Sequence, residues 1–128
     1  MKFIHTADWH LGKIVHGIYM TENQRDMLQQ FLQIVEEEQP DAIIIAGDLY
    51  DRSVPPTEAV NLLDEILFTI NIKMKIPVIA ISGNHDSAER LAFGSSWYKH
   101  SQLYISGKLE EEIEPIRLHG VNFYCVPY

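Results

Sequence analysis

The sequence has little cysteine, few basic residues and no long apolar run. Its single cysteine, Cys125, excludes an internal disulfide framework and a four-cysteine zinc site. No apolar stretch approaches the ~18 residues of a membrane-spanning helix, and the first residues lack the apolar segment of a secretory signal. These absences predict a soluble cytoplasmic protein with no membrane association.

Basic residues are outnumbered by acidic ones. The 128 residues include 10 Lys or Arg and 18 Asp or Glu, for a net charge of −8. Because non-specific nucleic-acid binding usually relies on a basic face, the composition argues against that mode of binding. Two acidic runs, Glu36–Glu38 and Glu110–Glu114, are typical of solvated surface. The length fits about one small domain.

Three short apolar segments predict buried parallel strands. They are Phe3–Ala7, Ala42–Ala46 and Val78–Ile81. Helical periodicity separates them, so the order favours an α/β fold of βαβαβ units. Near the end, segments 116–118 and 121–126 flank His119-Gly120 and predict a β-hairpin that begins a second layer.

The helices are predicted from apolar stripes. One runs over Thr21–Glu38, where Thr21 and Gln24 have the spacing of a capping box. A second runs over 56–70, and a shorter third covers about 88–98. The stripe of the second helix is wider than one sheet face requires, so we expect a homodimer in which a second copy contacts it. The candidate contact residues are Leu63, Leu67 and Ile70.

Polar side chains follow each predicted strand. Asp8 and His10 follow the first, Asp48 the second, and Asn84 with His85 the third. Because ligands bind at the carboxyl ends of parallel strands, we expect one shared pocket. Asp8 and His10 point to the same side if the strand stays extended. Carboxylate, imidazole and amide ligands suit Mn, Fe, Zn or Mg, and paired ions favour phosphoryl chemistry.

The motifs around these residues resemble a known family. Asp8-x-His10, Gly47-Asp48-x-x-Asp51-Arg52 and Gly83-Asn84-His85-Asp86 are similar to the first three motifs of the calcineurin-like metallophosphoesterases. Within that family, "HTADWHLGK", "AGDLYDRSVPP" and "SGNHDSAERLAFGS" resemble the SbcD-type nucleases. The resemblance covers residues 1 to about 107 and implies an α/β sandwich.

The resemblance implies a centre of two Mn²⁺ ions, with Mg²⁺, Fe²⁺ or Zn²⁺ as alternatives. Asp8 and His10 match ligands of one ion, Asp48 matches the ligand that bridges both, and Asn84 matches a ligand of the second.

The resemblance also implies catalytic roles. His85 matches the histidine that donates a proton to the leaving oxygen or steadies the scissile phosphate. Asp86 would orient that imidazole. Asp51 and Arg52 match positions that support the site.

One part of the family pattern does not occur in the sequence. The family has later histidine ligands in Gly-His and Gly-His-x-His, and neither motif is present in these 128 residues. We therefore expect residues 1–128 to be the N-terminal part of a nuclease domain, ending before those histidines. Such a chain would hold at most one ion weakly and be inactive alone.

The expected function is that of a metal-dependent DNA nuclease subunit, with exonuclease or endonuclease activity. The resemblance implies processing of double-strand breaks or hairpins together with an SbcC-type SMC-like ATPase. One alternative is a metallophosphoesterase acting on nucleotides or phosphoproteins. Another is a non-catalytic dimerisation scaffold.

Overall fold

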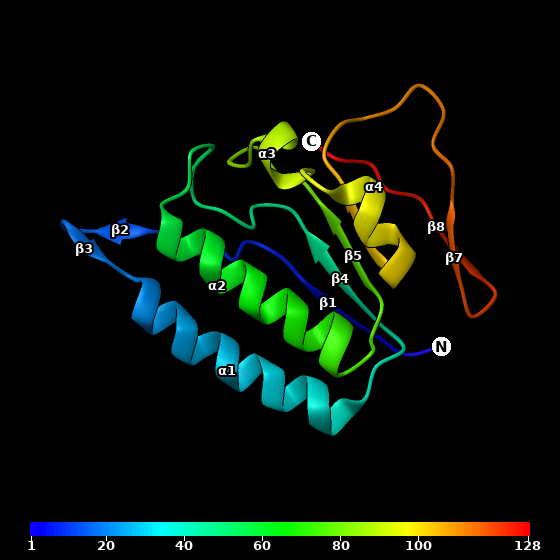
Figure 1. The fold of residues 1–128 in the computed structure, drawn as a ribbon, viewed down its shortest axis with the longest axis horizontal. Coiled ribbons are helices and arrows are strands. Elements are labelled where there is room, and N and C mark those ends of the chain that lie inside the picture. Colours follow the sequence, from blue (N-terminus) through cyan, green and yellow to red (C-terminus); the bar gives the residue numbers. More distant parts are fainter.

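The predicted strands assemble into one parallel sheet with a fourth strand beside them. The computed structural model describes all 128 residues, and Figure 1 shows the sheet beneath its helices. Strands β1 (Phe3–Thr6), β4 (Ala42–Ala46), β5 (Val78–Ile81) and β6 (Leu103–Ser106) lie in that order, and all are parallel. The α/β architecture is confirmed, while β6 was not predicted from the sequence.

Two long helices cover one face of the sheet. Helix α1 (Thr21–Glu38) has the predicted bounds, and α2 (Thr57–Phe68) continues into a π-helical turn over Thr69–Lys73. The two helices lie side by side (Figure 1), and Arg25 of α1 forms an ion pair with Glu65 of α2. Their apolar faces bury one large core against the sheet, and its fully buried members include Leu28, Val35, Ile43, Ile45, Leu62 and Ile66.

The predicted third helix is two short helices. Helix α3 spans Ala88–Leu91 and α4 spans Ser95–Tyr98, followed by a 3-10 turn over Lys99–Ser101. Gly94 separates them with a φ of 79°, a left-handed conformation that glycine adopts without a steric penalty. A continuous helix over 88–98 is therefore wrong, because Gly94 ends the first helical turn.

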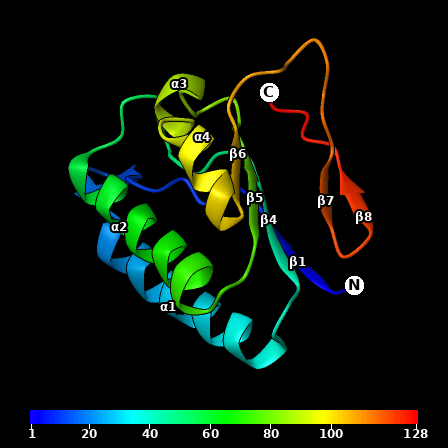
Figure 2. The same ribbon diagram turned by 45° about the vertical axis from the view of Figure 1, so that its right-hand side comes forward.

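The second face of the sheet carries the predicted hairpin. Strands β7 (Ile116–Leu118) and β8 (Val121–Phe123) pair antiparallel and lie on the side opposite the helices, as Figure 2 shows. Ala42, Ile79 and Leu118 form a small buried cluster there. This layer confirms the expected start of a second sheet.

A second hairpin, not predicted from the sequence, follows β1. Strands β2 (Ile14–Val15) and β3 (Ile18–Tyr19) pair antiparallel and project beyond the helices in Figure 1. The turn is His16-Gly17, with φ values of 50° and 76°, and the turn of the other hairpin is His119-Gly120, with 49° and 76°. Positive φ at both positions is the requirement of a tight two-residue hairpin turn.

The wide apolar stripe of α2 is buried within the chain. Leu63, Leu67 and Ile70 are 5%, 8% and 0% exposed. The expectation that these three residues contact a second copy is therefore wrong. All three belong to the main core, together with Leu91 of α3 and Leu103 of β6. A groove of about 410 Å³ lies between α2 and the segment 90–105. The apolar side chains that remain exposed around this groove are Val60, Phe68, Ile72, Phe93 and Trp97.

The predicted capping box is also wrong. The helix begins at Thr21, Met20 occupies the cap position, and no side chain caps the helix. The hydroxyl of Thr21 is buried without a hydrogen-bond partner. The Gln24 side chain turns instead to the loop that follows β1.

None of the helices has the length and apolar character needed to cross a lipid bilayer.

Candidate metal centre

The loops after β1 and β4 run side by side and carry the first three candidate ligands. The amide of Asp8 donates to the carbonyl of Gly47 at 3.0 Å, and the amide of His10 donates to the carbonyl of Asp48 at 2.9 Å. The next pair, Leu11 to Leu49, is also 2.9 Å long. These bonds extend the parallel pairing of the strands into the loops, so the two motifs are held in register.

Three candidate ligands have a left-handed backbone. The φ values of Asp8, His10 and Asp48 are 57°, 48° and 51°. A non-glycine residue in this region costs about 1–2 kcal/mol, and such outliers concentrate at functional sites. The Asp-x-His segment is therefore not extended, so the condition under which Asp8 and His10 were expected to point to the same side is not met. The two side chains are nevertheless close, with Nε2 of His10 3.9 Å from the Asp8 carboxylate.

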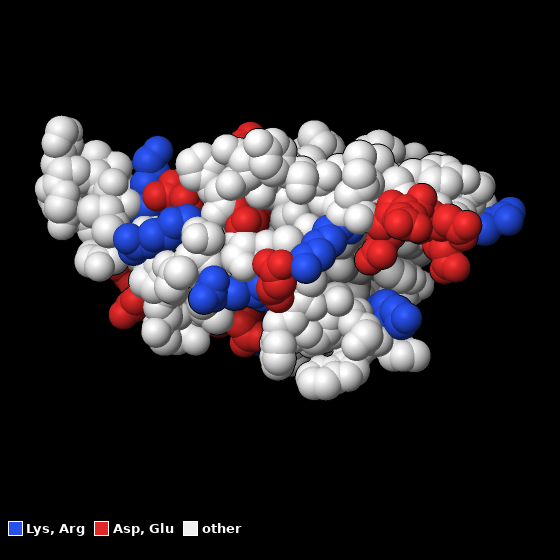
Figure 3. Space-filling model, turned by 90° about the horizontal axis from the view of Figure 1, so that it is seen from above, with Lys and Arg blue, Asp and Glu red and all other residues white.

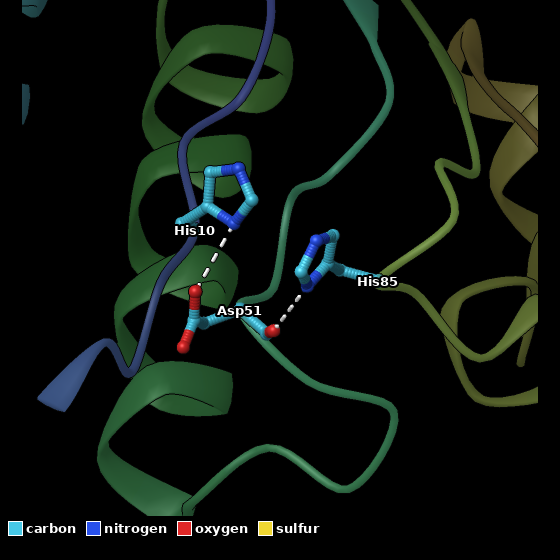
Figure 4. A group of neighbouring side chains, drawn as sticks. All are labelled: His10, Asp51 and His85. Atoms are coloured by element: carbon cyan, nitrogen blue, oxygen red, sulfur yellow. Dashed lines mark hydrogen bonds and ion pairs between the residues drawn. The ribbon is translucent and has the colours of Figure 1, made fainter.

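His10 lies at the centre of the cluster. Its Nε2 is 3.9 Å from Oδ1 of Asp8 and 3.6 Å from Oδ2 of Asp48, and its Nδ1 is 3.1 Å from Oδ1 of Asp51 (Figure 4). A carboxylate oxygen only accepts, so Nδ1 carries the proton and the lone pair of the neutral ring lies on Nε2. Two carboxylates and an imidazole nitrogen thus converge within 4.8 Å. This donor set fits a divalent cation, with Asp51 fixing the orientation of the ring.

Asp48 connects this group to the loop after β5. Its side chain is buried, and its Oδ1 accepts a hydrogen bond of 2.9 Å from the amide of His85. Its Oδ2 faces His10. Gly83 permits this approach, because a Cβ there would overlap both the Asp48 carboxylate and the Asp48 backbone nitrogen. One carboxylate therefore contacts both the first and the third motif.

The His85 ring lies beside that of His10. The ring centroids are 5.0 Å apart at 81°, and Nδ1 of His85 is 2.9 Å from the backbone carbonyl of Asp51 (Figure 4). Because a carbonyl only accepts, Nδ1 donates, and Nε2 is left free to exchange a proton with a ligand. Asp51 thus holds both imidazoles, one through its carboxylate and the other through its backbone.

Asp86 does not contact the His85 ring, contrary to expectation. Its carboxylate accepts from the amides of Leu49, Tyr50 and Gly83 at 3.2, 2.9 and 2.8 Å. It therefore ties the loop after β4 to the loop after β5, because three converging N–H groups outcompete a solvent-exposed ring. Burial and, to a smaller extent, the negative charge of the Asp86 carboxylate together raise the pKa of the Tyr50 phenol to about 12.

Two residues named from the sequence stand apart from this network. Asn84 is exposed in the turn between Gly83 and His85. Arg52 is exposed as well, in the loop after β4. Gln24 was assigned to a helix cap from the sequence, yet its amide contacts the backbone of the first motif. Gln24 is buried although its neighbours in the first turn of α1 are mostly polar, and residue spacing alone does not indicate this burial.

The face viewed from above carries no single basic patch. Figure 3 shows Lys and Arg side chains interspersed with Asp and Glu, and acidic side chains gather toward one end of the molecule. This face therefore lacks the excess of Lys and Arg that is typical of a non-specific nucleic-acid-binding surface.

Comparison with known proteins agrees with this geometry. The chain is 55% identical over all 128 residues to the SbcD component of the nuclease SbcCD from Staphylococcus epidermidis (strain ATCC 12228 / FDA PCI 1200) and spans 34% of that protein's length. The family description "Calcineurin-like phosphoesterase" matches residues 1–127. That match takes in the loops that carry Asp8, His10, Asp48 and His85 and the strands that place them, so the chain belongs to the calcineurin-like phosphoesterase family.

Proposed function

We propose that this chain contributes the first part of the active site of a metal-dependent DNA nuclease subunit. The observation that carries the proposal is the convergence of Asp8, His10 and Asp48 beside His85 at the ends of the parallel strands. The similarity to a protein named as a nuclease subunit supports a nucleic acid as the substrate, and the substrate that we propose is DNA. A DNA substrate in turn favours a cytoplasmic location.

Divalent cations fit the residues present. In this proposal Asp8 and His10 hold one ion, Asp48 bridges to a second, and Asn84 is a ligand of the second. When bound, such ions supply Lewis acidity and positive charge for phosphodiester hydrolysis. We propose Mn²⁺ as the ion, with Mg²⁺, Fe²⁺ or Zn²⁺ as the other candidates.

His85 is the proposed proton donor. Its Nδ1 is bonded to the carbonyl of Asp51, which leaves Nε2 as the atom that faces away from the protein network. In the imidazolium form, Nε2 can give its proton to the departing oxygen of the cleaved phosphodiester. Asp51 and Asp86 position this histidine, Asp51 by direct contact and Asp86 by joining the two loops.

We further propose that the site is completed by residues outside this chain. The chain spans about a third of the relative's length, and the family's later histidine motifs are not among its residues. Alone, residues 1–128 would hold at most one ion weakly and would not cut DNA. The partner proposed for the whole protein is an SbcC-type SMC-like ATPase, which fits the relative's name as one component of a complex.

A homodimer is proposed through the groove between α2 and α3–α4. The exposed rings of Phe68, Phe93 and Trp97 lie around it, at 50%, 70% and 66% exposure. Such a patch covered by a second copy would use the same surface on both chains. The test is the mass measured by light scattering: Trp97→Glu should lower it, and an unchanged mass would remove this interface.

The function is tested on the protein expressed from its complete gene. Wild type, His85→Ala and the exposed control His100→Ala are compared on linear double-stranded DNA with Mn²⁺. We expect His85→Ala to bind Mn²⁺ normally and to cut roughly 10²–10⁴-fold more slowly, while His100→Ala cuts like wild type. A small chromogenic phosphodiester assayed in parallel separates nuclease activity from general phosphoesterase activity.

Each alternative has its own outcome. Hydrolysis of nucleotides or phosphoproteins without DNA cleavage would replace the nuclease by another metallophosphoesterase. Absence of metal-dependent hydrolysis with an intact dimer would indicate a scaffold. Cleavage by His85→Ala within a few-fold of wild type would remove the role given to His85.

A further inference from the structure

Gln24 is a buried residue in the first turn of α1, and its side chain reaches the loop after β1 that carries Asp8 and His10. Its exposed fraction is 9%, and it lies 14 residues beyond His10 in the sequence. Between the two residues the chain leaves through the β2–β3 hairpin and returns. The hydrogen bonds of Gln24 therefore join the chain segments that precede and follow the β2–β3 hairpin.

The Gln24 amide makes three hydrogen bonds to the backbone of the loop that follows β1. Its Nε2 donates to the carbonyls of Trp9 at 3.2 Å and His10 at 2.8 Å. Its Oε1 accepts from the amide of Gly12 at 3.1 Å. Both the donor and the acceptor capacity of the amide are used, so neither Glu nor an apolar residue could reproduce the pattern.

The loop held in this way is strained. His10, a non-glycine residue, has a φ of 48°. A conformation of this kind persists only when surrounding contacts over-determine it. The carbonyl of Trp9 and the amide of Gly12 have no backbone partner, so the Gln24 amide is what satisfies them. The indole ring of Trp9 packs edge to face against the ring of Phe31 in α1.

We propose that Gln24 is a positioning residue for the metal ligand His10. It fixes the backbone on both sides of His10, and Asp51 fixes the ring, so Nε2 faces Asp8 and Asp48 before any ion binds. This inference rests on the metal centre proposed above. It adds a residue from α1, an element that contributes no ligand to that centre.

The test compares Gln24→Met with Gln33→Met in the protein expressed from its complete gene. Met has nearly the volume of Gln and removes only the polar contacts, and Gln33 is exposed on the same helix. We expect Gln24→Met to weaken Mn²⁺ binding in calorimetry about 10–100-fold and to change the visible spectrum of the Co²⁺-loaded protein. Gln33→Met should match wild type in both, and circular dichroism checks that the variants are folded.

Separate outcomes distinguish this inference from the proposed metal centre. Wild type that binds no Mn²⁺ would overturn both. Wild type and Gln24→Met that bind Mn²⁺ equally, with the same Co²⁺ spectrum, would overturn the role of Gln24 and leave the centre intact.

A measurement on wild type covers the case in which Gln24→Met does not fold. With ¹⁵N-labelled glutamine, the side-chain amide signal of Gln24 should shift during a Zn²⁺ titration, and those of Gln29 and Gln33 should not. A Gln24 signal that stays unchanged at saturation would overturn the proposal.

Discussion

Replacing Asp86 tests whether its carboxylate joins the two loops or orients His85. The carboxylate accepts three backbone N–H groups at 2.8 to 3.2 Å, two of them through Oδ2. Each hydrogen bond to a charged group contributes about 1.5–3 kcal/mol. In Asp86→Asn the remaining oxygen can serve Leu49 and Gly83, but the new amide then faces the amide of Tyr50 as donor against donor.

We therefore expect Asp86→Asn to lower the free energy of unfolding by about 2–3 kcal/mol, and Asp86→Ala by about 3–5 kcal/mol. Urea denaturation of the metal-free protein, followed by tryptophan fluorescence, measures both. Asp26→Asn is the matched control, because Asp26 is exposed on α1 and makes no such contacts.

One outcome would contradict this structural role. If Asp86→Asn unfolds within about 0.5 kcal/mol of the Asp26→Asn control and only DNA cleavage falls, Asp86 acts on His85 and not on the loops. If Asp86 joins the loops, the loss of stability is seen without any metal or substrate.

Three further predictions follow from the same geometry. Gly83→Ala should reduce Mn²⁺ affinity at least about 10-fold, because its Cβ would push against the backbone nitrogen of Asp48; calorimetry decides, and unchanged affinity would contradict the close approach. Asp48→Ala should lose more metal than Asp8→Ala in elemental analysis, because a bridging carboxylate serves both ions; equal losses would contradict the bridge. Tyr50→Phe should remove one phenol that ionises near pH 12 in an absorbance titration. Because the folded state raises the pKa of this phenol from 10.0, its contribution to stability is intact below pH 10 and is lost as the pH rises toward 12. The free energy of unfolding of Tyr50→Phe should therefore fall less steeply with pH in this range than that of wild type.

The βα alternation and the position of the polar motifs follow from the sequence alone. Continuous β-branched runs such as Ala42–Ala46 and the apolar stripe of Thr21–Glu38 are local signals, and both elements have the predicted bounds. Because the ends of parallel strands meet at one edge, the motifs that follow them had to come together. Asp8, His10, Asp48 and His85 were therefore identifiable as neighbours without a structure.

Contacts between segments distant in sequence depend on the folded chain. Strand β6 pairs with β5 in the folded chain, and its four residues are too few for their periodicity to distinguish a strand from the adjoining turn. Asp86 bonds amides 36 and 37 residues away, and Gln24 bonds a loop that its own helix does not adjoin in sequence. A carboxylate or an amide near a motif has several partners within reach along the chain. Only the folded arrangement brings specific backbone groups close enough to satisfy it, because a buried polar group takes whichever partner the surrounding packing leaves available.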